Sequence, residues 1–316
     1  MSDRPTAVDR FRTAQLRLLV ASGSHGTSRV VRVRDGYAHV IEAGSGDPVV
    51  LLGGDGCVAA TWAPLLADLE GSHHVFAADR PGCGLSDPLT TAGASFRDQA
   101  AGFVEELLDA LGAASASLVG SGMGGYWALA FALAHPERTD RLALLGAPAG
   151  SAGRPALRAR LLATPVLGAL VPDGVPGRSR RRLPTALARR RLVAHPERLV
   201  DPMLDVIHAG WMLPGVRRAH RATARAIARP WRTSRLTHAL RDDLGRLEAP
   251  TLLVWGERDP CPEPGGRELA DLLPQARLAV VPGAGHLVWL DEPEQTSALL
   301  RRFLGAASRQ AAQQRP

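Results

Sequence analysis

The stretch Leu118-Val119-Gly120-Ser121-Gly122-Met123-Gly124-Gly125 decides the fold of this chain. A short apolar run from Ala116 to Val119 precedes the turn, and a helical run from Tyr126 to Ala134 follows it. A strand, a glycine-rich turn and a helix in this order place residue 122 at the tip of the turn. In the pattern G-x-S-x-G this tip holds a nucleophilic serine. Here the tip is Gly122, so the motif keeps its frame and lacks its nucleophilic side chain.

The same letters fit a second motif, the dinucleotide-binding pattern G-x-G-x-x-G, through Gly120, Gly122 and Gly125. That pattern requires an acidic residue at the end of the next strand to hold a ribose. The next expected strand, Arg141 to Leu145, runs into Gly146 with no acid. The pattern also comes after several strands instead of in the first strand–helix unit. We therefore set the dinucleotide interpretation aside.

Composition narrows the class of protein. A chain of 316 residues with 45% hydrophobic residues is long enough to bury a large core. No apolar run is long enough to span a membrane, and the arginine-interrupted start lacks a signal-peptide pattern, so we expect a cytoplasmic protein. The three cysteines have neither a disulfide framework nor metal-ligand spacing. No metal or cofactor motif is present, and we expect neither group.

The net charge of +7 comes entirely from arginine, because the chain contains no lysine. Arginine is densest between Arg178 and Arg191. A solvated helical face is the ordinary interpretation of such a run, and attraction for an acidic partner such as a carrier protein is the alternative. A nucleic-acid partner is not expected, since the basic run has no interleaved aromatic residues and no recognisable module.

Strands and helices alternate over most of the chain, which predicts a mostly parallel central sheet flanked by helices. The alternation stops near Gly150, and from there to about Leu244 the pattern is helical and broken by prolines. We interpret this part as an inserted helical cap. The predicted organisation is an N-terminal leader (1–28), an α/β core (29–150 and 246–305), the cap (151–245) and a disordered tail (306–316).

Five motifs in order resemble the α/β-hydrolase fold family, in its capped branch that is similar to esterases and epoxide hydrolases. They span roughly residues 30 to 305, and together in this order they are specific. They are Gly53-Gly54 before Trp62, Asp79-Arg80-Pro81-Gly82, the Gly122 turn, Gly256-Glu257-Arg258-Asp259, and Gly285-His286 followed by Glu292-Pro293.

The resemblance implies an order of nucleophile, acid and histidine along the chain. It assigns the acid to Asp259 and the base to His286. An aspartate that accepts a hydrogen bond from one imidazole nitrogen fixes the tautomer and leaves the other nitrogen available as a base. The resemblance also implies an oxyanion hole made by the backbone N–H groups of Asp55 and Met123. The family usually has histidine where this chain has Gly53, and that departure loosens the expected loop.

Three functions are compatible with Gly122. Ser121 could replace the missing nucleophile, although the residue before the tip normally points away from the pocket. Alternatively, a water molecule fills the space of the missing side chain and His286 acts as a general base, in an elimination, cyclisation, isomerisation or direct hydrolysis. The third possibility is a pocket that only binds a ligand. Retention of Asp259 with His286 favours the second interpretation, because pure binding does not require that pair.

We expect the substrate to be a small, mostly apolar metabolite. Four residues are candidates to line its pocket: Gly54, Cys57, Trp211 and Trp231. The ordinary role of Cys57 is that of a small packing residue, and that of the two tryptophans is packing within the cap.

Overall fold

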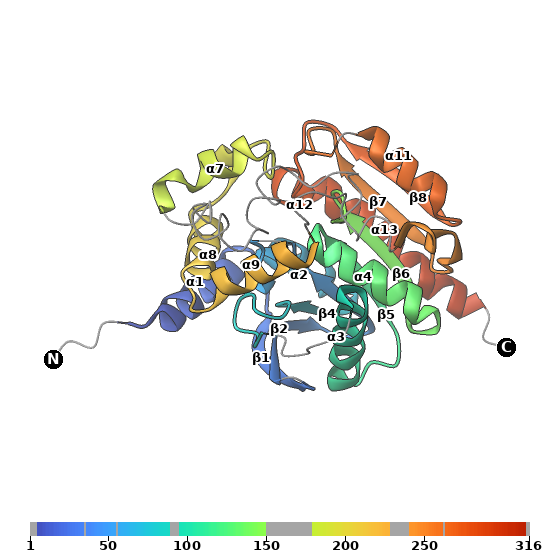
Figure 1. Cartoon of the computed structure of the whole chain (residues 1–316), viewed down its shortest axis with the longest axis horizontal. Coiled ribbons are helices and arrows are strands. Elements are labelled where there is room, and N and C mark those ends of the chain that lie inside the picture. The colour runs from blue at the N-terminus through green and yellow to red at the C-terminus, as the bar shows by residue number, and fades with distance from the viewer. Residues whose placement is uncertain are drawn as a thin grey trace.

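The computed structural model describes residues 5–34, 36–54, 56–88, 95–149, 179–227, 240–261 and 263–313. Its centre is an eight-stranded sheet with the order β1-β2-β4-β3-β5-β6-β7-β8 (Figure 1). The pairs β1–β2 and β2–β4 are antiparallel, and the other pairs are parallel. This confirms the predicted mostly parallel sheet. The strands are β1 Thr27–Val33, β2 Gly36–Gly44, β3 Asp47–Leu52, β4 His73–Ala78, β5 Ala116–Ser121, β6 Thr139–Leu145, β7 Thr251–Gly256 and β8 Ala276–Val281.

Helices cover both faces of the sheet, because its central strands are apolar on both sides. Every residue of β5 and β7 is buried. On one face Phe103 of α3 and Trp127 of α4 join the core, and on the other Leu65 of α2 and Leu300 of α13 do so. The helices of the α/β core are α2 Ala63–Leu69, α3 Phe96–Leu111, α4 Met123–Ala134, α11 Glu263–Leu272, α12 Val288–Asp291 and α13 Pro293–Gln313, with 3-10 turns η1 Ala59–Trp62, η2 Pro136–Arg138 and η6 Leu244–Arg246.

The described part of the predicted cap is helical. Between β6 and β7 it contains η4 Arg180–Arg182, α7 Leu183–Arg189, η5 Pro196–Arg198, α8 Asp201–Trp211 and α9 Val216–Ile227. In Figure 1 helices α7, α8 and α9 lie to the left of strands β6, β7 and β8. The stretches 150–178 and 228–239 of the predicted cap lie outside the described residues. The helical character of the rest agrees with the proline-broken pattern of the sequence.

The predicted N-terminal leader is helical, as its amphipathic pattern predicts, whereas the C-terminal end differs from the predicted disordered tail. Helix α1 Ala7–Ala21 starts at a capping box formed by Thr6 and Asp9, buries Phe11 and Leu18, and packs against α8. Helix α13 continues to Gln313, well past the predicted start of the tail at residue 306. The alanine, arginine and glutamine residues of this last part are strong helix formers, which explains the longer helix.

Candidate active site at the strand-to-helix turn

The turn after β5 has the geometry predicted for a nucleophile position. Strand β5 ends at Ser121, α4 begins at Met123, and Gly122 between them has φ 53° and ψ −116°. Residues other than glycine rarely adopt these backbone angles, and adopting them costs on the order of 1–3 kcal/mol. A Cβ on Gly120 would lie 2.6 Å from Cα of Gly125, and one on Gly124 would collide with the carbonyl oxygen of Leu52. The flanking glycines therefore allow the close approach of helix and sheet that forms the turn.

These contacts give a test of the turn with two glycine-to-alanine substitutions. Gly124→Ala is expected to destabilise the fold by several kcal/mol, because the backbone of β3 blocks the new methyl group. Gly102→Ala in α3 is expected to stabilise it by about 0.5–1 kcal/mol, since nothing lies within 4 Å of that position. Urea unfolding of the two variants and the wild type measures both effects. Equal stabilities would contradict the described packing of α4 on β3.

Asp259 and His286 meet as predicted. Nδ1 of His286 lies 2.8 Å from Oδ2 of Asp259. Asp259 follows β7 and is 3% exposed, and it also accepts hydrogen bonds from the backbone N–H groups of Ala147 (3.1 Å) and Cys261 (2.8 Å). Since the carboxylate only accepts, the proton between the two side chains belongs to Nδ1 of His286. In the neutral ring Nε2 is then the basic nitrogen.

Nε2 of His286 faces Gly122. An ideal Cβ built on Gly122 would lie 3.0 Å from this nitrogen. The side chain of His286 is 16% exposed, so the ring is reachable from solvent. The structure therefore brings together all three positions of the family pattern, with a histidine–aspartate pair and a glycine at the nucleophile position.

Ser121 does not replace the missing nucleophile in this geometry. Its side chain is fully buried, and its Oγ has no hydrogen-bond partner among the described residues. The residue belongs to β5, where it pairs with Leu145 of β6. A hydroxyl enclosed in the sheet core cannot reach an ester, so the geometry disfavours a displaced serine nucleophile.

Of the two predicted oxyanion-hole donors, Met123 lies among the described residues. Met123 occupies the first position of α4, where backbone N–H groups have no partner within the helix and attract negative charge. Gly54 packs against the turn: a Cβ there would lie 3.5 Å from Cα of Gly122 and from N of Met123. The side chain of Arg80 donates from Nε to the carbonyl oxygen of Gly53 at 2.6 Å, which holds this loop. Asp55, the other predicted donor, lies outside the described residues.

Cys57 and Trp211 line one cavity beside helices α8 and α9 of the predicted cap. The cavity itself has a volume of about 20 Å³, and the space around it, which includes a part open to solvent, is about 380 Å³. Residues of the loop after β3, of the loop after β4 and of helices α8 and α9 form its wall, and most are small or apolar: Gly56, Cys57, Val58, Cys83, Gly84, Gly210, Trp211, Val216, Ala219, His220 and Thr223. Trp231, the fourth predicted pocket residue, lies outside the described residues.

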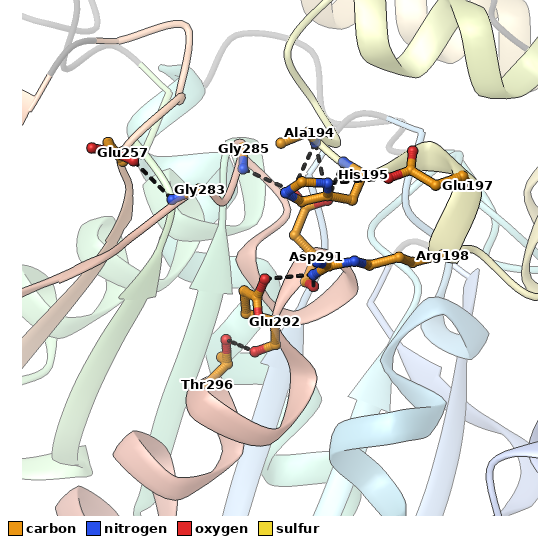
Figure 2. Close-up of polar contacts among 10 residues, drawn as sticks. All are labelled: Ala194, His195, Glu197, Arg198, Glu257, Gly283, Gly285, Asp291, Glu292 and Thr296. Atoms are coloured by element: carbon orange, nitrogen blue, oxygen red, sulfur yellow. Dashed lines mark hydrogen bonds and ion pairs between the residues drawn. The ribbon is translucent and has the colours of Figure 1, made fainter.

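Asp291 supports the loop that contains His286 and has no counterpart among the predicted site residues. It is 1% exposed and accepts hydrogen bonds from the N–H groups of Gly285 (2.7 Å), Ala194 (2.9 Å) and His195 (2.8 Å), as Figure 2 shows. Gly285 directly precedes His286, and Ala194 and His195 lie in the predicted cap. One buried carboxylate therefore connects the predicted cap to the loop of His286.

Backbone hydrogen bonds strengthen the same connection. The N–H of His286 donates to the carbonyl of Arg191 at 3.0 Å, and that of Leu287 donates to Leu192 at 2.8 Å. Arg191 has a left-handed φ of 54°. The sequence shows only an acidic residue five positions after the histidine, and nothing in it indicates partners a hundred residues earlier.

Part of the arginine-rich segment has partners within the protein. Arg180 binds Asp205 at 2.7 Å and Asp201 at 2.5 Å, and these hydrogen bonds raise the pKa of its guanidinium. Among the described residues no helix is long and apolar enough to cross a bilayer. Within the same ranges, no three His, Cys, Asp or Glu side chains are grouped to hold a metal ion.

Comparison with known proteins agrees with this geometry. The family model of the α/β hydrolase fold matches residues 47–293. The 2-hydroxy-6-oxononadienedioate/2-hydroxy-6-oxononatrienedioate hydrolase of Cupriavidus pinatubonensis is 30% identical over 297 residues, covering 89% of this chain and 96% of that protein. A 2-hydroxy-6-oxo-6-phenylhexa-2,4-dienoate hydrolase of Burkholderia cepacia is 28% identical over 283 residues, covering 84% of this chain and 90% of the relative.

Solved structures show the same fold. The naproxen esterase of Bacillus subtilis superposes with a TM-score of 0.72 at 20% identity, over 95% of this chain and 99% of the esterase. A meta-cleavage product hydrolase from Pseudomonas fluorescens IP01 gives a TM-score of 0.70 at 23% identity, over 88% of this chain and 98% of that one. The sequence relatives are named hydrolases, which supports an enzyme of the hydrolase type. By its family match, its sheet order and the geometry of its turn, this chain belongs to the α/β-hydrolase fold family.

Proposed function

We propose that this protein is a hydrolase that activates water directly, with His286 as general base and no covalent intermediate. Asp259 orients the imidazole and stabilises its protonated form. The substrate is a small carbonyl compound with an apolar arm. The relatives named as hydrolases favour this reaction over the elimination, cyclisation or isomerisation that a histidine–aspartate pair alone also allows.

The observation that carries the proposal is the distance between Gly122 and His286. The point where a side chain would begin at Gly122 lies 3.0 Å from Nε2, so no side chain of residue 122 stands between this nitrogen and a water molecule. A water molecule that donates to Nε2 lies farther from Cα of Gly122 than a bonded Cβ would, and it loses its proton to the ring as its oxygen attacks the carbonyl carbon. The N–H of Met123 at the start of α4 stabilises the negative oxygen that develops. The bond from the carbonyl carbon to the leaving group then breaks, and the leaving group takes the proton back from Nε2.

The apolar wall of the cavity beside the loop after β3 favours a substrate with an apolar arm. Its wall begins two residues after Gly54, which packs on the turn, and it includes the ring of Trp211 and the side chains of Val58 and Val216. The Burkholderia cepacia relative is named for a 2-hydroxy-6-oxo acid with a phenyl group on the carbonyl carbon. An aromatic arm of this kind matches an apolar wall better than a second carboxylate does. We therefore propose a 2-oxo or 2-hydroxy acid with a ketone and an apolar substituent as the substrate class.

The test uses 2-hydroxy-6-oxo-6-phenylhexa-2,4-dienoate as the probe, with loss of its absorbance as the readout. Wild-type protein is expected to consume it and release benzoate. His286→Ala is expected to lower turnover roughly 10²- to 10⁴-fold, the usual contribution of a general base, while binding of the compound is largely kept. His25→Ala is the control, because His25 is a surface histidine paired with Glu70.

Three results would overturn the proposal. A wild type that binds the compound without consuming it would make the protein a ligand-binding member of the family. Turnover that persists in His286→Ala would show that His286 is not the general base. A trapped acyl-enzyme after rapid quenching and mass spectrometry would show a covalent mechanism, and the position of the acyl group would identify the nucleophile.

A further inference from the structure

A contact between a serine, a histidine and an aspartate lies away from the Gly122 turn. Oγ of Ser28 lies 2.7 Å from Nε2 of His39, and Nδ1 of His39 lies 2.7 Å from Oδ2 of Asp79. Ser28 is on β1, His39 is on the neighbouring strand β2, and Asp79 directly follows β4. The three side chains come together because β1, β2 and β4 are adjacent in the sheet.

The hydrogen bonds of Asp79 determine which atom donates and which accepts in these two side-chain contacts. Its side chain is fully buried and accepts from the N–H groups of Ala59 (2.6 Å) and Leu85 (3.0 Å) as well as from His39. A carboxylate with these partners acts only as an acceptor, so Nδ1 of His39 carries the proton. In the neutral ring Nε2 is then an acceptor, and the hydroxyl of Ser28 donates to it. This is the arrangement in which a histidine withdraws the proton of a serine nucleophile.

Ser28 is open to solvent although its two partners are buried. The serine is exposed on the edge strand of the sheet, whereas His39 is 1% exposed. Val30, which is 58% exposed, lies two residues further on the same face of β1. A small electrophile therefore has access to the hydroxyl and an apolar side chain next to it.

We infer that Ser28 is a second nucleophile, activated by His39 and oriented through Asp79, which small activated esters acylate. The serine Oγ forms a bond to the ester carbonyl carbon, and the bond from that carbon to the leaving oxygen breaks. His39 takes the serine proton at Nε2 and passes it to the leaving oxygen. With a fluorophosphonate, the new bond is to phosphorus and fluoride leaves. This site is separate from the proposed water-activating pair and does not depend on it.

The chain contains a second exposed serine–histidine contact for comparison. Ser72 is also exposed, and its Oγ lies 2.8 Å from Nδ1 of His73. Burial lowers the pKa of His73, and the charge of Asp47 on the paired strand β3 acts in the opposite direction. Ser72 therefore contacts Nδ1 of its histidine, whereas Ser28 contacts Nε2 of a ring whose Nδ1 donates directly to the buried carboxylate of Asp79.

The experiment treats the full-length protein with a fluorophosphonate probe and maps the labelled peptides. Label is expected at Ser28, at a rate roughly 10²-fold or more above that at Ser72, and Ser28→Ala is expected to abolish it. Ser28→Ala is a mild change on an exposed strand, so it is expected to fold normally and to keep any His286-dependent turnover. A chromogenic short-chain ester should give a burst of aryl alcohol that is likewise lost in Ser28→Ala.

Two outcomes decide against the inference. If neither serine is labelled, or if both are labelled at similar rates, His39 and Asp79 serve only to satisfy each other inside the sheet. If the label is elsewhere and Ser28→Ala leaves it unchanged, the reactive group is a different residue. Label and burst that both disappear with the Ser28 hydroxyl support the second nucleophile.

Discussion

Gly122→Ser is expected to convert this protein into a hydrolase with a covalent intermediate. The new Cβ would lie 3.0 Å from Nε2 of His286, so the ring must retreat by a few tenths of an ångström and the new Oγ comes within hydrogen-bond reach. The variant should be labelled by a fluorophosphonate at residue 122. In a Ser28→Ala background, which removes the burst inferred for Ser28, it should release about one aryl alcohol per protein in a burst from an ester. Because φ is 53° at this position, the variant should be less stable by about 1–3 kcal/mol.

Gly122→Ala is the matched control for this prediction. A methyl group introduces the same backbone strain and occupies the same space beside His286, but it supplies no nucleophile. Label at residue 122 is therefore expected in the serine variant alone. The alanine variant should also lose the proposed water-activated turnover, since its methyl group lies against Nε2 of His286 and keeps the attacking water away from it. An alanine variant as active as the wild type would contradict the approach of water to Nε2 from the side of Gly122.

Asp259→Asn is expected to lower turnover by roughly 10²- to 10⁴-fold with little change in fold. The carboxylate accepts on one oxygen from Cys261 and on the other from Ala147 and His286. An asparagine has a single acceptor oxygen. If that oxygen keeps the bond from Cys261, the amide group donates to Nδ1 of His286, and the ring proton moves to Nε2. The ring then has no basic nitrogen facing Gly122.

Steady-state kinetics with the phenyl-substituted probe, alongside circular dichroism, measures the effect of Asp259→Asn. Asp243→Asn makes the same chemical change at a partly exposed ion pair with Arg97, away from Gly122, and should leave turnover near the wild-type value. Turnover of Asp259→Asn within a few-fold of the wild type would mean that the acid does not control the tautomer of His286.

Local signals made much of the core predictable. The bounds of α3 follow from its apolar spacing and from its ends: Ser95 caps the start, and Gly112 closes the helix with φ 71°. The buried strands could be predicted because they are apolar on both faces, as in β3 and β7. The Gly122 turn could be placed because a strand, a glycine-rich turn and a helix follow one another in the sequence, and Asp259 and His286 because the order of the motifs resembles that of the α/β-hydrolase fold family.

Contacts between distant parts of the chain could not be predicted in the same way. Asp291 is one acid among 31 acidic residues in the sequence, and its partners Ala194 and His195 contribute only backbone N–H groups, which any residue has. The contact of Ser28 with His39 depends on the register of β1 against β2, in which Val30 pairs with His39. Neither feature has a local sequence pattern, because each depends on how separate segments of the chain are placed in the fold.

The connection through Asp291 limits how far the sequence of the predicted cap can change without moving the loop that holds His286. Caps are insertions, and an insertion that touches the core only at its ends can be exchanged as a module. Here residues 191–195 of the predicted cap bind the loop that holds His286, the proposed base, through Asp291 and two backbone hydrogen bonds to residues 286 and 287. We therefore expect a chimera that takes its cap from a relative to misplace His286 unless it keeps this short segment. Substrate preference and the placement of the base would then change together in such a chimera.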